Sequence, residues 1–232
     1  MCPYFTLIAW LVAMPVLGQS ATALNSQGVE HLRVRKYAEA IEKFQQAIEV
    51  DESHALAHYN FAATLARVRG RGAVCEFSAY RATIISELQR SIELDPRRRE
   101  RALVDKDFKT VHDTLGWQFI AGKTVEKNAA EILRAVTWYG PAPGAFGPMS
   151  GVRFERGGKV SSWVLDLSGD SARRVVSEGG KWTVSGVTVT IESSTRPGDQ
   201  PRRATWTLGP SGLVATTPGA PSYTDDPDEC SA

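Results

Sequence analysis

The chain has 232 residues, of which 27 are Lys or Arg and 26 are Asp or Glu, so its formal net charge is +1. This near-neutral balance argues against a nucleic-acid-binding protein, which usually carries a basic excess or a basic stripe. A hydrophobic content of 42% with 23% charged residues excludes a disordered chain and is typical of a globular protein. Three cysteines are too few for a disulfide-rich scaffold.

The first 23 residues predict an export signal. They contain no charged side chain, and residues 4–18 form an apolar run that is shorter than the roughly 20 residues of a membrane-spanning helix. Ala21 and Ala23 provide small residues at the two positions that signal peptidase reads, so we expect cleavage after Ala23. No Lys or Arg precedes the run, and a retained N-terminal anchor is the alternative. We expect an exported protein, periplasmic or extracellular, from a bacterial source.

Two kinds of hydrophobic periodicity follow the signal. Residues 25–68 and 80–94 carry the three-and-four spacing of amphipathic helices. From about residue 137 onward, Trp, Val and Thr alternate with polar residues in short segments separated by Gly and Pro, which is typical of strands. The order predicts an α+β fold, with a helical domain over 24–130 and a small antiparallel sheet or barrel over 131–218.

The helical half contains an internal repeat. Residues 47–51 (Ala-Ile-Glu-Val-Asp) recur as residues 91–95 (Ser-Ile-Glu-Leu-Asp), at the period of about 34 residues of tetratricopeptide repeats plus an insertion near 68–78. Residues 25–96 therefore resemble a tetratricopeptide-repeat protein, and residues 99–120 are expected to close the stack. The resemblance rests on the following residues of the first repeat: Gly28, Tyr37, Ala38, Glu39, Ala40, Phe44, Ala47 and Asp51, with residues 57–62 beginning the second.

The resemblance implies a groove that binds a protein or peptide and is lined by the first helix of each pair. Its candidate partner-binding residues are Arg33, Tyr59, Asn60 and Arg67. Two basic residues beside an aromatic one suit an acidic or polar segment, because Arg and aromatic anchors dominate interface energetics. This prediction requires Tyr59 to be at least partly accessible. Helix packing alone is the alternative explanation for the aromatic and small residues of the repeat.

Residues 181–191 predict a β-hairpin. With Ser185 and Gly186 at a two-residue turn, Val184 would pair with Val187 and Trp182 with Val189, all on one face. A second hairpin is expected at residues 157–158 and a further strand around residues 204–208.

Residues 135–216 resemble the small lipocalin-like domains of exported bacterial proteins. The resemblance rests on Trp138, on the hairpin over 154–160 and on residues 180–184 (Gly-Lys-Trp-Thr-Val). It implies an up-and-down sheet that curls around an apolar ligand.

No motif supports an enzyme, a cofactor or a metal site. Residues 116–124 look like a phosphate-binding loop, but five residues separate Gly116 from Gly122 where four are required. His54 and His58 are four residues apart, but no third ligand follows at a zinc-site spacing. We therefore expect a non-enzymatic protein without cofactors or bound metal.

Cys75 and Cys230 are the thiols that remain after removal of the signal. A disulfide between them is one alternative, because an exported protein meets an oxidising compartment. The other is that both stay free, because residues 219–232 are acidic near their end and are expected to form a disordered tail.

Two functions remain open at this point. The first is an exported adaptor or scaffold that holds a partner protein in the repeat groove, with no nucleic acid and no stable membrane insertion after signal cleavage. The second is a carrier that encloses a small apolar ligand in the β-domain. The interior of the sheet distinguishes them, because a solidly filled interior favours the adaptor and an open cavity favours the carrier.

Overall fold

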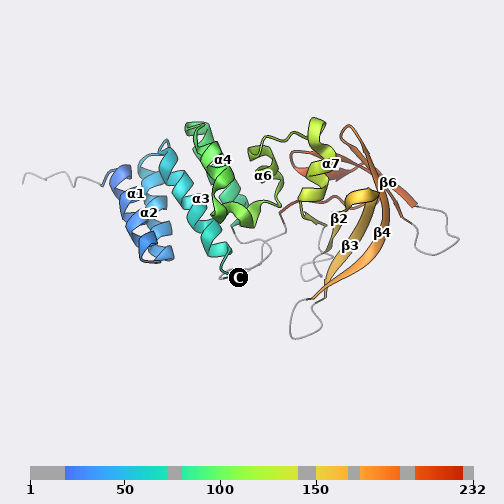
Figure 1. The fold of residues 1–232 in the computed structure, drawn as a ribbon, viewed down its shortest axis with the longest axis horizontal. Helices are drawn as coiled ribbons and strands as arrows, with labels where there is room; N and C mark the ends of the chain where they lie inside the picture. Colours follow the sequence, from blue (N-terminus) through green and yellow to red (C-terminus); the bar gives the residue numbers. More distant parts are fainter. Residues whose placement is uncertain (1–18, 73–79, 141–149, 167–172, 194–201, 227–232) are drawn as a thin grey trace, which may run out of the picture.

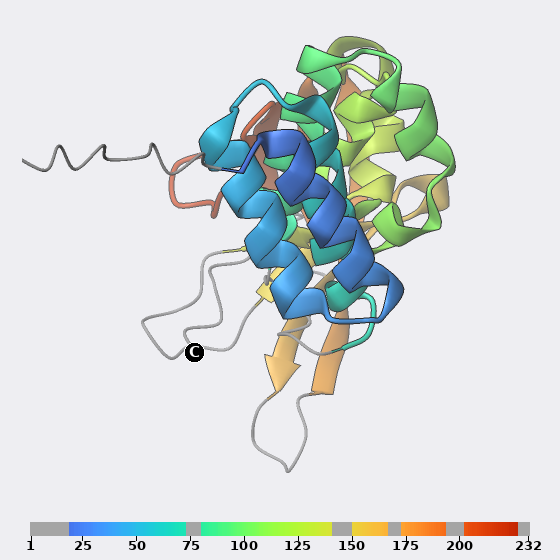
Figure 2. The ribbon, with the colours of Figure 1, turned by 90° about the vertical axis from the view of Figure 1, so that its left-hand side faces the viewer.

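The computed structural model describes residues 19–72, 80–140, 150–166, 173–193 and 202–226. Helices occupy the chain up to residue 135, and an antiparallel sheet curled into a half-barrel follows (Figure 1). The view along the long axis shows the helices stacked in front of the sheet (Figure 2). The predicted α+β fold, with helices first and strands second, is confirmed.

Two consecutive antiparallel helix pairs begin the fold, followed by shorter helices. Phe44, Phe61, Ile84 and Leu88 are buried together in the core of this half. The arrangement is compatible with helical repeats, and the closing element expected at 99–120 is present as short helices. The helices are α1 (Ala21–Arg33), α2 (Tyr37–Val50), α3 (Ala55–Arg69), α4 (Arg81–Leu94), α5 (Arg98–Val104), the 3-10 helix η1 (Lys106–Val111), α6 (Leu115–Ile120) and α7 (Val125–Ala135).

Gly28 sets the close approach of α1 and α2. A Cβ atom at this position would lie 2.5 Å from Cε1 of Phe44, and Phe44 is fully buried. Carbon atoms in contact are about 3.5–4.0 Å apart, so the aromatic ring occupies the space that any larger residue would need.

The sheet is a seven-stranded meander in which each strand pairs with the next. The hairpins expected at 157–158 and at 181–191 are both present, as is the strand around 204–208. The strands are β1 (Trp138–Tyr139), β2 (Ser150–Phe154), β3 (Lys159–Asp166), β4 (Arg173–Ser185), β5 (Thr188–Ser193), β6 (Arg202–Gly209) and β7 (Gly212–Ala215), with a short 3-10 turn, η2 (Arg156–Gly158), between β2 and β3.

The register of the β4–β5 hairpin differs from the prediction. Val184 pairs with Val189 and Trp182 with Ile191, so the predicted pairing is wrong by two residues. The turn consists of Gly186 and Val187, and Gly186 has a φ of 57°, a left-handed conformation that glycine adopts at little cost. Because side chains alternate with period two, a shift of two residues keeps each side chain on its predicted face.

Helix α7 covers the concave side of the half-barrel. Its Ile132 and Leu133 are fully buried and share one core with Trp138, Val189 and Leu208. The apolar spacing along α7 explains this contact, since its buried residues recur on one helical face. The predicted domain boundary at residue 131 falls within α7, whose buried face packs in the core of the sheet.

A segment near residue 224 links the two edges of the sheet. Leu213 of β7 exchanges two backbone hydrogen bonds with Tyr223, of 2.8 and 2.9 Å, and Tyr139 of β1 exchanges two with Thr224, also of 2.8 and 2.9 Å. The indole of Trp206 donates to the Pro221 carbonyl at 2.8 Å. The predicted disordered tail is therefore wrong from residue 221 to 226, which pack on the fold, while residues 227–232 lie outside the described part.

The N-terminal helix begins before the predicted cleavage point. Ser20 caps α1, its hydroxyl accepting a hydrogen bond from the amide of Ala23 at 3.2 Å, and Ala21 is buried. Within the described residues, no helix combines the length and apolar character that crossing a bilayer requires. Cys75 and Cys230 both lie outside the described residues, so the disulfide stays a prediction.

Candidate functional site

The predicted groove residue Tyr59 is buried between helices. Only 1% of it is exposed, its hydroxyl donates to Oδ2 of Asp105 at 2.9 Å, and its ring meets Phe108 edge-on at 5.6 Å. Burial, reinforced by the Asp105 carboxylate, raises the pKa of Tyr59 well above its ordinary value. The accessibility that the prediction for Tyr59 requires is therefore absent, because Phe108 of η1 packs against its ring.

The other predicted residues of α3 also form internal contacts. Asn60 donates to Oδ1 of Asn25 at 2.9 Å, which ties α3 to α1. Arg67 donates to Oδ2 of Asp107 through Nε at 3.0 Å and Nη2 at 2.5 Å, and this carboxylate raises the pKa of Arg67. These side chains hold α3 against its neighbours rather than forming a partner site.

Arg33 stays on the surface. Its side chain is 68% exposed and pairs with Glu30 of its own helix at 2.7 Å. An exposed pair of this kind contributes little to stability, and it presents no preorganised site.

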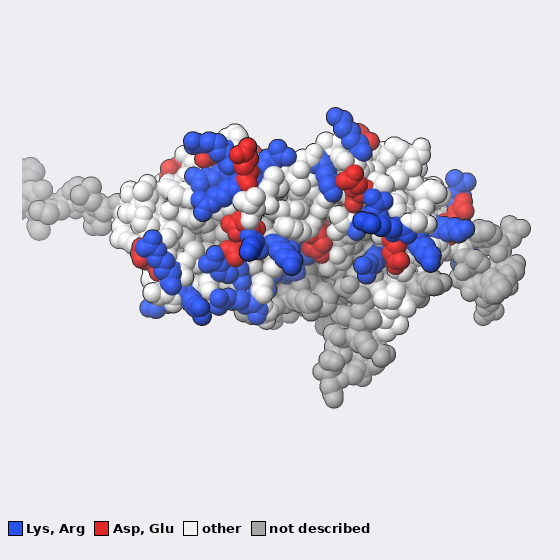
Figure 3. Space-filling view, viewed as in Figure 1, with Lys and Arg blue, Asp and Glu red and all other residues white. Residues whose placement is uncertain are grey.

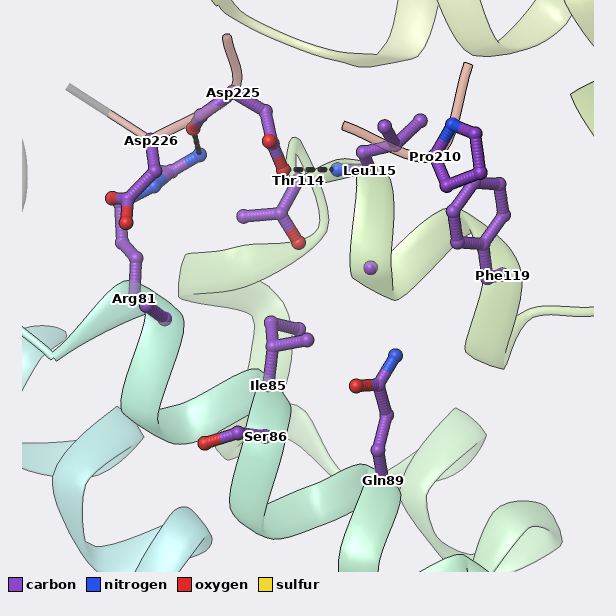
Figure 4. Close-up of a pocket in the computed structure, with 12 residues that line it drawn as sticks. Arg81, Ile85, Ser86, Gln89, Thr114, Leu115, Phe119, Pro210, Asp225 and Asp226 are labelled. Carbon is purple, nitrogen blue, oxygen red and sulfur yellow. Dashed lines mark hydrogen bonds between the residues drawn. The ribbon is translucent and has the colours of Figure 1, made fainter. Parts of the chain in front are cut away.

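A pocket of about 430 Å³ lies at the junction of the helices and the sheet (Figure 4). We call it the junction pocket. Ile85 of α4, Leu115 and Phe119 of α6, and Pro210 provide its apolar surface. Polar side chains from α4, from the N-cap of α6 and from the C-terminal segment surround this surface: Ser86, Gln89, Thr114, Asp225 and Asp226.

Arg81 lines the junction pocket and is almost completely buried. Its side chain is 3% exposed, Nη1 donates to Oδ1 of Asp113 at 3.0 Å, and Nη2 donates to the carbonyl oxygen of Asp225 at 3.2 Å. The other carboxylate oxygen of Asp113 accepts from the hydroxyl of Thr137 at 2.8 Å. This network joins α4, the loop before α6, the start of β1 and the C-terminal segment.

One buried donor in this network lacks an acceptor. Nε of Arg81 has no hydrogen-bond partner among the described residues. More than about nine in ten buried polar groups in proteins are hydrogen-bonded, so a buried N–H without a partner calls for an explanation. This nitrogen is itself buried, so an oxygen of a ligand would reach it only if the surrounding side chains moved.

An acidic side chain binds the N-terminus of α6. Oδ2 of Asp225 accepts a hydrogen bond from the backbone amide of Leu115 at 2.6 Å, and the hydroxyl of Thr114 caps the same helix by accepting from the amide of Trp117 at 3.1 Å. Carboxylates are favourable at helix N-termini, where backbone amides lack partners. The C-terminal segment is thereby fixed at the rim of the junction pocket.

The histidines considered as metal ligands have structural roles. Nδ1 of His58 lies 2.5 Å from Oε2 of Glu87, and Nε2 lies 3.1 Å from the carbonyl oxygen of Glu52. His54 caps α3, with Nδ1 accepting from the amide of Ala57 at 3.1 Å. Over the part of the chain that the structure describes, no group of three or more His, Cys, Asp or Glu side chains could hold a metal ion.

Comparisons with known proteins give no relative from which a function can be transferred. No known protein family matches the chain, and no curated protein is similar to it in sequence. The function must therefore be argued from the geometry. Sequence reasoning missed the junction pocket because its key residue is an arginine, and arginine is almost never fully buried unless it is paired.

Proposed function

We propose that the protein is a non-enzymatic adaptor of the tetratricopeptide-repeat type that holds a peptide segment of a partner protein in the junction pocket. The observation that carries the proposal is the unpartnered Nε of buried Arg81 beside an apolar pocket. A backbone carbonyl of a bound peptide would supply the missing acceptor once the side chains around this nitrogen shift on binding. The helical order and the internal repeat support the repeat resemblance, and repeat proteins commonly bind partners on their extended surfaces.

The chemistry of the junction pocket suits one apolar side chain of the partner. Its volume of about 430 Å³ lies within the range of roughly 300–1,000 Å³ that ligand sites occupy. Ile85 and Phe119 offer an aliphatic and an aromatic contact, and the buried Arg81 lines the same pocket. Interfaces draw most of their energy from such buried anchors, surrounded by polar contacts that exclude water.

The filled interior of the half-barrel favours the adaptor over the carrier. Trp138, Trp182 and Trp206 are buried in the core that α7 completes. Aromatic and aliphatic side chains therefore occupy the space in which a carrier would hold its ligand. We therefore propose that the lipocalin-like resemblance extends to the order of the strands but not to the binding of a ligand.

Export is part of the proposal, with a revised cleavage point. Cleavage after Ala23 would remove both the cap Ser20 and the buried Ala21. Cleavage after Gly18 would leave α1 complete and would place Val16 and the small residue Gly18 at the two positions that signal peptidase reads. Sequencing the N-terminus of protein from the native host tests this: Gln19 supports the revised point, Leu24 the first one, and Met1 a retained anchor.

Quantitative affinity capture from the native host tests the adaptor. Ser86 lies exposed at the rim of the junction pocket, so Ser86→Trp fills the pocket without disturbing the core. Thr83→Trp is the matched control, because Thr83 is an exposed hydroxyl residue of α4 that does not line the pocket. We expect a protein that is captured by the wild type and by Thr83→Trp to be lost with Ser86→Trp.

Two results would contradict the adaptor. The first is a set of captured proteins that Ser86→Trp leaves unchanged. The second is an apolar small molecule that stays bound in native mass spectrometry of the purified protein, since this would favour the carrier.

A further inference from the structure

A second surface, separate from the junction pocket, gathers unpaired arginines. Two adjoining hollows of about 570 and 360 Å³ lie between the end of α7 and the β2–β3 hairpin, and both are lined by Arg134, Arg153 and Glu155. Arg156 lines the larger one. We call the two together the arginine groove. Figure 3 shows Lys and Arg side chains over both the helical end and the sheet end of the molecule, with Asp and Glu side chains among them.

The three arginines of the groove have no counter-charge of their own. Arg134, Arg153 and Arg156 are exposed, and they form no ion pair or hydrogen bond with any residue in the described ranges. Two acidic residues also line the groove, but each has another contact. Glu131 pairs with Lys123 at 3.4 Å. Glu155 accepts from the neutral hydroxyl of Ser161 at 3.1 Å, which leaves its negative charge in the groove.

Only one of these three arginines carries a positive charge that stabilises its own element of secondary structure. Arg134 lies in the last turn of α7, where a positive charge is favourable beside the unpaired carbonyl groups. Arg153 is in the middle of a strand, opposite Ser161, and Arg156 is in the turn after it. Four cations against two carboxylates leave the larger hollow with a positive excess, which an anion bound between the arginines would neutralise.

The edge of β2 beside the groove is open. β1 pairs only with Gly151 and Val152, so the last two residues of β2, Arg153 and Phe154, have no strand partner on that side within the described chain. An open strand edge binds an extended peptide through backbone hydrogen bonds. A compact anion would leave this edge unused.

We infer that the arginine groove binds an acidic peptide segment of a partner protein in an extended conformation, with its carboxylates on Arg134, Arg153 and Arg156. The planar guanidinium group matches a carboxylate through two parallel N–H bonds, which gives direction as well as attraction. The near-neutral net charge of +1 means that this attraction is local to the groove and does not come from the protein as a whole. This site is independent of the junction pocket.

Fluorescence anisotropy with fluorescein-labelled octaglutamate tests the inference. We expect saturable binding to the full chain that weakens as salt increases. The variant Arg134→Glu with Arg153→Glu should weaken it by about tenfold or more, which corresponds to about 1.4 kcal/mol. Labelled octalysine should not bind in the groove.

A control variant separates the groove from a general charge effect. Arg33→Glu with Arg90→Glu makes the same change in net charge at exposed positions of α1 and α4, and it should change the affinity by less than about twofold. Circular dichroism checks that each variant is folded. If the charge reversal unfolds the protein, Arg134→Gln with Arg156→Gln replaces it.

Three results would overturn the inference. The first is that octaglutamate does not bind to the full chain, and the second is that both double variants weaken its binding equally. A labelled oligothymidylate that binds more tightly than octaglutamate, and loses binding in the groove variant, would instead identify a phosphate backbone as the ligand.

Discussion

Replacing Arg81 by Met tests whether the buried network holds the helices and the sheet together. The substitution removes the ion pair with Asp113 and the hydrogen bond to the Asp225 carbonyl while keeping the apolar stem. Breaking a fully buried pair costs about 3–5 kcal/mol, but Asp113 is 38% exposed and recovers part of its solvation. With the lost hydrogen bond included, we expect the free energy of unfolding to fall by about 2–4 kcal/mol.

The control is Arg90→Met, which removes an exposed pair with Glu93 whose side chains are 47% and 65% exposed. It should cost less than about 1 kcal/mol. Equilibrium unfolding in urea, followed by tryptophan fluorescence and by far-ultraviolet circular dichroism, measures both variants. In Arg81→Met combined with Asp113→Asn, the loss should be smaller than the sum of the single losses, because the unpaired charge is removed as well. If Arg81→Met costs no more than Arg90→Met, the reasoning about burial is refuted.

Three further predictions concern stability. Gly28→Ala should destabilise the protein by about 1 kcal/mol, because overpacking against Phe44 outweighs the gain of about 1 kcal/mol in helix propensity. A higher melting temperature of this variant would show that α1 and α2 are not in tight contact. Ile132→Ala should lower the free energy of unfolding by about 2–5 kcal/mol, whereas an effect as small as that of Lys127→Ala on the exposed side of α7 would be inconsistent with the filled half-barrel. Partial burial lowers the pKa of His112 below its ordinary value of about 6.5. Because the unfolded chain then takes up the proton at a higher pH than the folded protein, stability should fall slightly as the pH drops below about 6.5. Thermal melts across that range should show a smaller decrease for His112→Phe.

The helices and strands were predictable because each carries a one-sided pattern. α2 and α4 bury one stripe each, and the strands of the sheet alternate between core and solvent. The apolar face of α7 was also visible in the sequence, as Val125, Ala129 and Leu133 recur four residues apart, but its assignment to the sheet depends on where the chain turns afterwards.

The contacts of the candidate partner-binding residues were not predictable in the same way. α3 is buried on several sides, including at Tyr59, Phe61 and Leu65, so its periodicity does not distinguish an open groove from a contact with η1. The pairing of Arg67 with Asp107 joins residues that are far apart in the sequence, and no local pattern encodes it. The closure of the sheet was hidden for a related reason: it depends on backbone hydrogen bonds of Tyr223 and Thr224 within a polar segment.

The sheet can close only after Tyr223 and Thr224, near the C-terminal end of the described chain, have been synthesised. A ribosome delivers β1 long before Thr224, so the edges of β1 and β7 stay unpaired while most of the sheet already exists. Unpaired edges in incomplete chains are the usual starting points of aggregation. A fusion placed directly after residue 226 therefore interferes with the last step of closure, whereas a fusion before Gln19 does not, and the two should differ in the yield of soluble protein.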